Sequence, residues 1–137
     1  MLAVYLAGAS KEVDELQGLV LQLRNHPRIE VHDRWMRDVI RSREAGVADH
    51  AYPRNEQRAF ARADLDDLRR ADVFWLAVPK EKGSVGAWVE LGHALAQRHL
   101  HIVVSGDLDR SIFIHACERA KVFSAHELAV AHIRELP

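Results

Sequence analysis

The chain has 137 residues, of which 48% are hydrophobic and 28% charged, a composition typical of one folded domain and unlike that of a disordered chain. Nineteen basic and 20 acidic residues give a net charge of −1, which argues against a nucleic-acid or anionic-membrane binder. The single cysteine, Cys117, excludes an intramolecular disulfide, and every apolar run is shorter than the ~20 residues of a membrane span, so we expect a cytoplasmic protein.

The first half of the chain begins with an apolar run, residues 2–7, that ends at Gly8 and predicts a buried central strand rather than a signal peptide. Ser10 is a candidate cap for a helix that extends to about Arg24. Residues 28–32 alternate and predict a second strand. Residues 36–53 are polar, and we expect a partial helix there, followed by a loop.

The second half alternates between helical and strand patterns. Its strands are predicted from short apolar runs, the most apolar of which is VFWLAV, and its helices from apolar residues at helical spacing. The expected helices are 55–70, 84–98 and one that follows Ser124 as its cap; the expected strands are 73–78, 101–105 and 121–123.

Strands that alternate with helices predict a parallel sheet with right-handed crossovers. We expect a single three-layer α/β domain over residues 1–137, with about five strands in the flavodoxin-like order 2-1-3-4-5 and helices on both faces. Ligands of such folds bind beyond the carboxyl ends of the strands. That edge gathers Gly8 to Ser10, the loop after His32, and residues 79–90.

Glu90 is the first candidate site residue. Its helix is expected to pack on the sheet through an apolar face, and Glu90 is expected to lie off that face; the face consists of Val85, Trp88, Val89, Gly92 and Leu95. The small Gly86 one turn earlier leaves room for a ligand, and the nearby helix N-terminus favours the ionised carboxylate that a nucleophile requires. The alternative is that Glu90 is a solvated helix residue.

Asp64 begins an acidic segment, DLDDLRRAD, in which Leu65 and Leu68 indicate a helix rather than a calcium loop. We expect Asp64 to point toward the carboxyl edge of the sheet. The nine histidines include no pair at i, i+4 and no acidic or cysteine partner at ligand spacing, so we expect no metal site.

Cofactor motifs are missing from the sequence. Neither GxGxxG nor GxxxxGK[ST] is present, so we expect no dinucleotide or triphosphate cofactor. Trp75 and Trp88 are expected in the core, whereas Trp35, in HDRW after the second predicted strand, is a candidate for stacking on a base, with core packing as the alternative.

Four segments in order resemble the nucleoside 2-deoxyribosyltransferase family over nearly the full length of the chain. They are VYLAGAS, LRNHPRIEVHDRW, RADLDDLRRADVFWLAV and SVGAWVELGHALAQ, the last being the most specific. The resemblance implies a flavodoxin-like domain that cleaves the N-glycosidic bond of 2′-deoxynucleosides and transfers the sugar to another base. It assigns Glu90 as the nucleophile, Tyr5 as the residue that holds its carboxylate, and Asp64 as the contact to the leaving base.

The sequence departs from the family pattern at three places, one of which is residues 36–53, a segment without a clear counterpart in the family. Ser84 stands where many members carry an aspartate, and the asparagine that reaches a neighbouring active site is replaced by a segment that offers Ser111 or His115. The resemblance implies a homo-oligomer, a dimer or higher, and the apolar residues 112–114 are either its contact or part of the monomer core.

These departures leave three functions open. The first is deoxyribosyl transfer through Glu90. The second is hydrolysis of deoxynucleoside 5′-monophosphates, as in a related branch of the family, with the phosphate near Ser10 and Lys11 at a helix N-terminus. The third is a module that binds a nucleoside or nucleotide without turnover.

Overall fold

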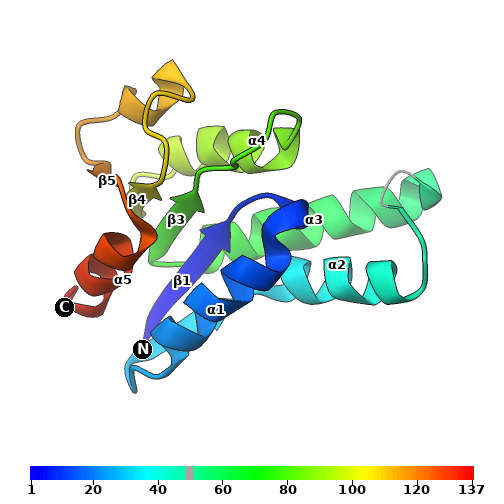
Figure 1. The fold of residues 1–137 in the computed structure, drawn as a ribbon, viewed down its shortest axis with the longest axis horizontal. Helices are drawn as coiled ribbons and strands as arrows, with labels where there is room; N and C mark the ends of the chain where they lie inside the picture. Colours follow the sequence, from blue (N-terminus) through cyan, green and yellow to red (C-terminus); the bar gives the residue numbers. More distant parts are fainter. Residues whose placement is uncertain (49–50) are drawn as a thin grey trace.

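The computed structural model describes residues 1–48 and 51–137. Its centre is a parallel sheet of five strands in the order β2-β1-β3-β4-β5, which confirms the predicted architecture and strand order (Figure 1). The strands are β1 (Leu2–Ala7), β2 (Ile29–His32), β3 (Val73–Ala77), β4 (His101–Ser105) and β5 (Lys121–Phe123).

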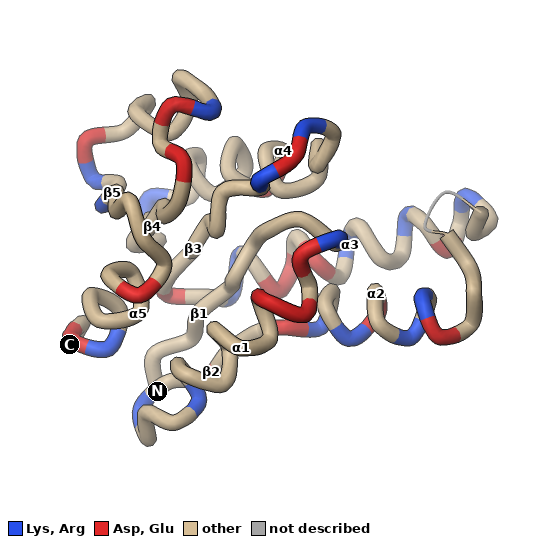
Figure 2. Tube along the Cα trace, viewed as in Figure 1, with Lys and Arg blue, Asp and Glu red and all other residues tan. Residues whose placement is uncertain are grey.

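Helices cover both faces of the sheet and form the outer two layers. On one face α1 (Val13–Arg24) packs against α5 (His126–Arg134), and on the other α3 (Arg54–Arg70) packs against α4 (Val85–Leu95). α2 (Arg34–Glu44) runs beside α3, and both helices reach beyond the sheet, on the right of Figure 1. Charges of both signs alternate along these two helices (Figure 2). No helix in the described ranges is both long and apolar enough to span a membrane.

The core is formed by the apolar runs that predicted the central strands. All five residues of β3 are buried, and so are five of the six residues of β1, because these strands have helices on both faces. The apolar spacing of Val13, Leu16, Val20 and Leu23 predicts the buried face of α1, and the structure buries these residues together with Leu19. The sheet therefore holds the carboxyl end of β1 rigidly where the functional site was expected.

Two predicted helix caps are wrong. Ser10 lies in a 3-10 turn, Ser10–Glu12, and α1 begins only at Val13 with Glu12 at the N-cap position. Ser124 precedes the true N-cap residue of α5, which is Ala125. The α-helices begin later than the capping preference indicated, since the N-cap of α1 lies two residues after Ser10 and that of α5 one residue after Ser124.

The polar segment 36–53 is more helical than expected. Its helix, α2, already begins at Arg34, and a left-handed turn at Gly46, with φ of 69°, follows its end. The prediction for residues 49 and 50 falls outside the described part of the chain. α2 thus continues almost directly from β2 and can form a wall beside the carboxyl edge.

A buried hydrogen-bonded chain joins β3, β4 and α5. The Trp75 indole N–H donates to Ser105 Oγ at 2.8 Å, and Ser105 Oγ lies 2.7 Å from His126 Nδ1. Because an indole N–H only donates, Ser105 Oγ accepts the hydrogen bond from Trp75, and its second bond joins it to the His126 ring. The serine therefore satisfies two buried or partly buried rings at once.

We expect Ser105→Ala to lower the free energy of unfolding by about 2 kcal/mol, because it leaves the buried Trp75 N–H without an acceptor. Urea denaturation measures the change. Ser124→Ala, at an exposed serine outside this chain of bonds, should change stability by less than about 0.5 kcal/mol. Equal stabilities of the Ser105 variant and the wild type would contradict the assignment.

Candidate functional site

A cavity of about 640 Å³ lies at the carboxyl edge of the sheet, between the loop after β1, the helices α2 and α3, and the N-terminal end of α4. It contains most of the residues singled out from the sequence. Those that line it are Gly8, Ser10, Trp35, Asp64, Ser84, Gly86 and Glu90. Segments far apart in the chain therefore meet where ligands of open α/β sheets bind.

Tyr5 and Glu90 form the central contact of this cavity. The Tyr5 hydroxyl, near the end of β1, donates a hydrogen bond to Glu90 Oε2 on α4, across 85 positions of sequence. The Tyr5 ring is 1% exposed and stacks on Phe74 of β3 with ring centroids 6.1 Å apart. The core of the sheet thus fixes the tyrosine, and the tyrosine fixes the carboxylate.

Burial changes the protonation of both groups. Burial, and to a smaller extent the charge of Asp64, raises the pKa of Glu90 from 4.5 to about 7, against the opposing effect of the Tyr5 hydrogen bond. Burial and then the Glu90 charge raise the pKa of Tyr5 well above its ordinary value, so its hydroxyl remains a donor. The expectation that the environment of Glu90 favours its ionised form is wrong, because removal from water outweighs the helix N-terminus.

The predicted packed face of α4 is wrong in part: Trp88 and Leu95 pack against the core, but the other three predicted members are exposed. The helix packs on the sheet through Ala87, Leu91 and Ala94, and Glu90 lies on that same side. Val85 and Val89, assigned to the core, are 66% and 58% exposed. Small residues allow α4 to approach the sheet closely, and this approach brings Glu90 within reach of Tyr5.

The remaining predicted residues of the cavity have distinct surroundings. The Trp35 indole N–H donates to the Leu6 carbonyl at 2.8 Å, so its ring is a fixed part of the wall. Ser84 occupies the N-cap position of α4. A Cβ added to Gly8 would lie 2.7 Å from Leu16 Cδ1, so this glycine permits close packing of β1 on α1, whereas Gly86 faces open space.

Ser111 and His115 lie outside this cavity, on the segment between β4 and β5. Ser111 caps a 3-10 turn, Ile112–His115, by accepting a hydrogen bond from the Phe113 backbone, and His115 Nε2 lies 3.1 Å from the Leu108 carbonyl. Within one chain, therefore, both side chains hold their own loop. The family resemblance instead predicts that Ser111 or His115 reaches the active site of a neighbouring copy of the chain.

Two helix stripes line the cavity wall, and of their members only Trp35 and Asp64 were singled out from the sequence. On α2 the cavity is lined by Trp35, Asp38, Val39 and Ser42, and on α3 by Gln57, Phe60, Ala61 and Asp64. Both sets have the spacing i, i+3, i+4, i+7, which places their members on one helix face. This spacing could have indicated a cavity wall from the sequence. It did not, because a helix face with both polar and apolar side chains also occurs on ordinary surface helices.

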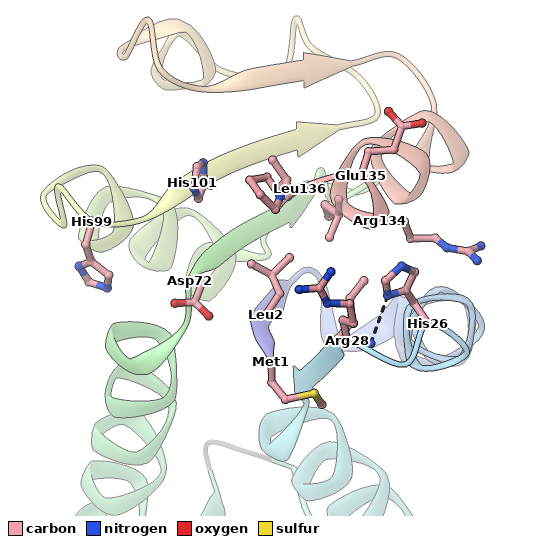
Figure 3. A pocket seen from close by; sticks show the side chains of 13 residues that line it. Met1, Leu2, His26, Arg28, Asp72, His99, His101, Arg134, Glu135 and Leu136 are labelled. Carbon is pink, nitrogen blue, oxygen red and sulfur yellow. Dashed lines mark hydrogen bonds between the residues drawn. The ribbon is translucent and has the colours of Figure 1, made fainter.

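A second cavity, of about 560 Å³, lies at the amino ends of the strands (Figure 3). Its polar groups connect chain segments. Asp72 Oδ2 accepts from the Ala3 backbone at 2.8 Å, and His26 Nδ1 accepts from the Arg28 backbone at 3.3 Å. The carboxyl-edge cavity is the better candidate site, because ligands of open α/β sheets bind at that edge and Glu90 lines it under the hydrogen bond from Tyr5.

No family model, curated protein or solved structure matches this chain, so its functional assignment depends on the geometry of the cavity. Among residues 1–48 and 51–137, no three histidine, cysteine, aspartate or glutamate side chains are grouped to hold a metal ion. The carboxylates of Asp64 and Glu90 and the aromatic wall are the groups that the cavity offers, and the buried Tyr5 acts on them through its hydrogen bond to Glu90.

We expect Glu90→Gln to stabilise the protein at pH 8 by on the order of 2 kcal/mol. With a folded pKa of about 7 against 4.5, the folded protein binds more protons than the unfolded chain in that interval, so wild-type stability falls as the pH rises through it. The neutral amide removes this loss.

Urea denaturation at pH 5 and pH 8 tests the sign of the change in unfolding free energy that Glu90→Gln causes. The gain from Glu90→Gln should be small at pH 5 and larger at pH 8, whereas Glu118→Gln, at an exposed glutamate, should be near neutral at both. A Glu90→Gln variant that is less stable than the wild type at pH 8 would contradict the buried-carboxylate account.

Proposed function

We propose that this protein cleaves the N-glycosidic bond of 2′-deoxynucleosides and transfers the deoxyribosyl group to another base through a covalent intermediate on Glu90. The observation that supports this most is the Tyr5–Glu90 hydrogen bond inside a cavity that also contains Asp64. A carboxylate held by a buried hydroxyl and aimed at open space has the placement that a glycosyl nucleophile needs.

In the first step a Glu90 carboxylate oxygen attacks C1′ of the sugar as the bond from C1′ to the base nitrogen breaks. The electron pair of that bond stays on the base nitrogen, which takes a proton from the Asp64 carboxyl group and leaves Asp64 as a carboxylate. The sugar passes through an oxocarbenium-like state before it forms an ester with Glu90. The Tyr5 hydroxyl holds the carboxylate in one rotamer during the attack.

In the second step a ring nitrogen of an acceptor base attacks C1′, the ester bond breaks, and its electron pair returns to Glu90. The acceptor base loses its ring proton to the Asp64 carboxylate. The Asp64 carboxyl and the Glu90 carboxylate are thereby both restored. When water takes the place of the acceptor, the same step releases free deoxyribose. Transfer therefore depends on how well the cavity holds a base after the first has left.

Hydrolysis of a deoxynucleoside 5′-monophosphate is the second candidate. It is favoured by Lys11 and Lys82, which lie at the rim of the cavity beside Ser10 and Ser84 and can neutralise a phosphate. Lys11 is paired with Glu81 at 3.4 Å, which weakens this attraction. The nucleoside therefore remains the preferred substrate.

We also propose that the protein acts as a homo-oligomer. Ile112 and Phe113 are exposed at the tip of the segment that carries Ser111 and His115, while Ile114 is buried in the monomer. Exposed apolar side chains of this size favour contact with another protein surface. A second copy would cover them and bring Ser111 or His115 toward the neighbouring cavity.

Incubation of the protein with deoxynucleosides and their 5′-monophosphates, with and without a free base, tests the proposal by chromatography. We expect a new nucleoside only when the acceptor is present. Free base without an acceptor would support the hydrolase, and no product from any substrate would favour the binding module.

Glu90→Ala should lower the rate by at least roughly 10³-fold in a folded protein. A variant as fast as the wild type would exclude Glu90 as the nucleophile.

The pH profile tests the role of Tyr5. Since only ionised Glu90 attacks, kcat/KM should rise with pH and level off above about 7. The tyrosine hydrogen bond lowers this pKa, so Tyr5→Phe should move the inflection to higher pH and lower the plateau. Tyr52→Phe, whose hydroxyl instead bonds Ser42 at 2.6 Å, should leave the inflection in place. An unchanged profile in the Tyr5 variant would refute the coupling.

A further inference from the structure

The cavity extends away from Glu90 along α2 and α3. Each helix turns one stripe of side chains toward the cavity. On α3 the lining runs from Asp64 to Gln57, seven residues, or ~10 Å along the helix axis. The space between the two helices is therefore long enough to hold a flat ring system beyond the glycosidic bond.

The far wall of this space is aromatic and fixed. Phe60 lines the cavity, and Tyr52 holds it by an edge-on contact with ring centroids 5.2 Å apart. The Tyr52 hydroxyl bonds Ser42 of α2, and the Tyr52 carbonyl accepts from Gln57 of α3 at 2.7 Å. A base placed here has an aromatic surface against which to stack.

Asp38 is the charged group of this wall. Its side chain is only 20% exposed and lines the cavity from the second turn of α2. The cation paired with it, Arg41, is 77% exposed and lies 3.6 Å away, a loose contact on the solvent side. An ionised carboxylate has acceptors only, so the ligand group that it prefers is an N–H donor.

The opposite end of the cavity is suited to the sugar. The backbone-rich segments at Gly8 to Lys11 and at Lys82 to Gly86 lie there, next to Glu90. With C1′ at Glu90 and the base nitrogen at Asp64, the sugar faces these loops and the base points between α2 and α3. Arg34, one turn before Asp38, pairs with Asp67, one turn after Asp64, so Asp38 lies on α2 across the cavity from Asp64 and meets an edge of the base held between the two helices.

The geometry points to Asp38 as the residue that selects the base, in favour of bases that carry an exocyclic amino group, such as adenine and cytosine. The carboxylate accepts a hydrogen bond from the amino group, as acidic side chains do from cytosine in other complexes. Hypoxanthine and uracil place a carbonyl oxygen at the same position, which sets acceptor against acceptor. The inference rests on the proposed function for the reaction that the bound nucleoside undergoes. The selection itself is a property of base binding.

Matched substrate pairs test the selection. The intact protein should show a kcat/KM at least roughly tenfold higher for deoxyadenosine than for deoxyinosine, and for deoxycytidine than for deoxyuridine. Asp38→Asn replaces an acceptor by a group that also donates, so both ratios should fall to about one or below. Asp66→Asn is the matched control, because Asp66 pairs with Arg69 at i, i+3 on the outside of α3 and should leave the ratios unchanged.

Binding separates this inference from the proposed reaction. If the protein turns over all four nucleosides with equal kcat/KM, the selection by Asp38 is wrong and the reaction stands. If it turns over none, the proposed reaction fails, and calorimetry with adenine and hypoxanthine decides on Asp38 alone. Tighter binding of adenine that Asp38→Asn abolishes supports the subsite; equal binding, or none, overturns it.

Discussion

The hydrogen bond from Tyr5 to Glu90 is the constraint on which the site depends. It joins the central strand β1 to α4, so the position of the carboxylate is set by the core of the sheet rather than by the flexible rotamers of a glutamate. The bond requires α4 to lie close to the sheet, which the small residues Ala87 and Ala94 allow. It also requires a carboxyl group to leave water, which costs stability and raises its pKa.

The cavity beside this bond stays open because two ion pairs hold its helix walls. Arg34 at the start of α2 meets the buried Asp67 of α3 at 2.9 Å, and Arg24 of α1 meets the buried Asp33, just before α2, at 3.0 Å. Both pairs combine an aspartate side chain that is 10% exposed with an arginine side chain that is about half exposed. They fix where α2 begins, so the lining stripes of α2 and α3 face the cavity without collapsing on each other.

Much of the fold could be predicted because local pattern and burial agree. The run VFWLAV is β3 to within one residue, and the order of all five strands follows from alternating strands and helices. The failures lie where apolar character and burial disagree. Val85 and Val89 are apolar and exposed, while Glu90 is charged and faces the core side. Periodicity alone favoured the larger apolar residues such as Val85 and Val89. The predicted packed face therefore lay to one side of the buried face, which contains Ala87 and Ala94.

The sequence by itself determined the class of the fold, the strand order, and the meeting of Gly8, Asp64 and Glu90 at one edge, because parallel strands all deliver their carboxyl ends to the same side. Tertiary structure alone decided the protonation of Glu90 and the extent of the cavity. Both depend on how much water remains around a side chain once α4 packs against a strand whose tyrosine lies 85 positions earlier in the chain. Desolvation is a property of the packed neighbourhood, and no local pattern of residues encodes it.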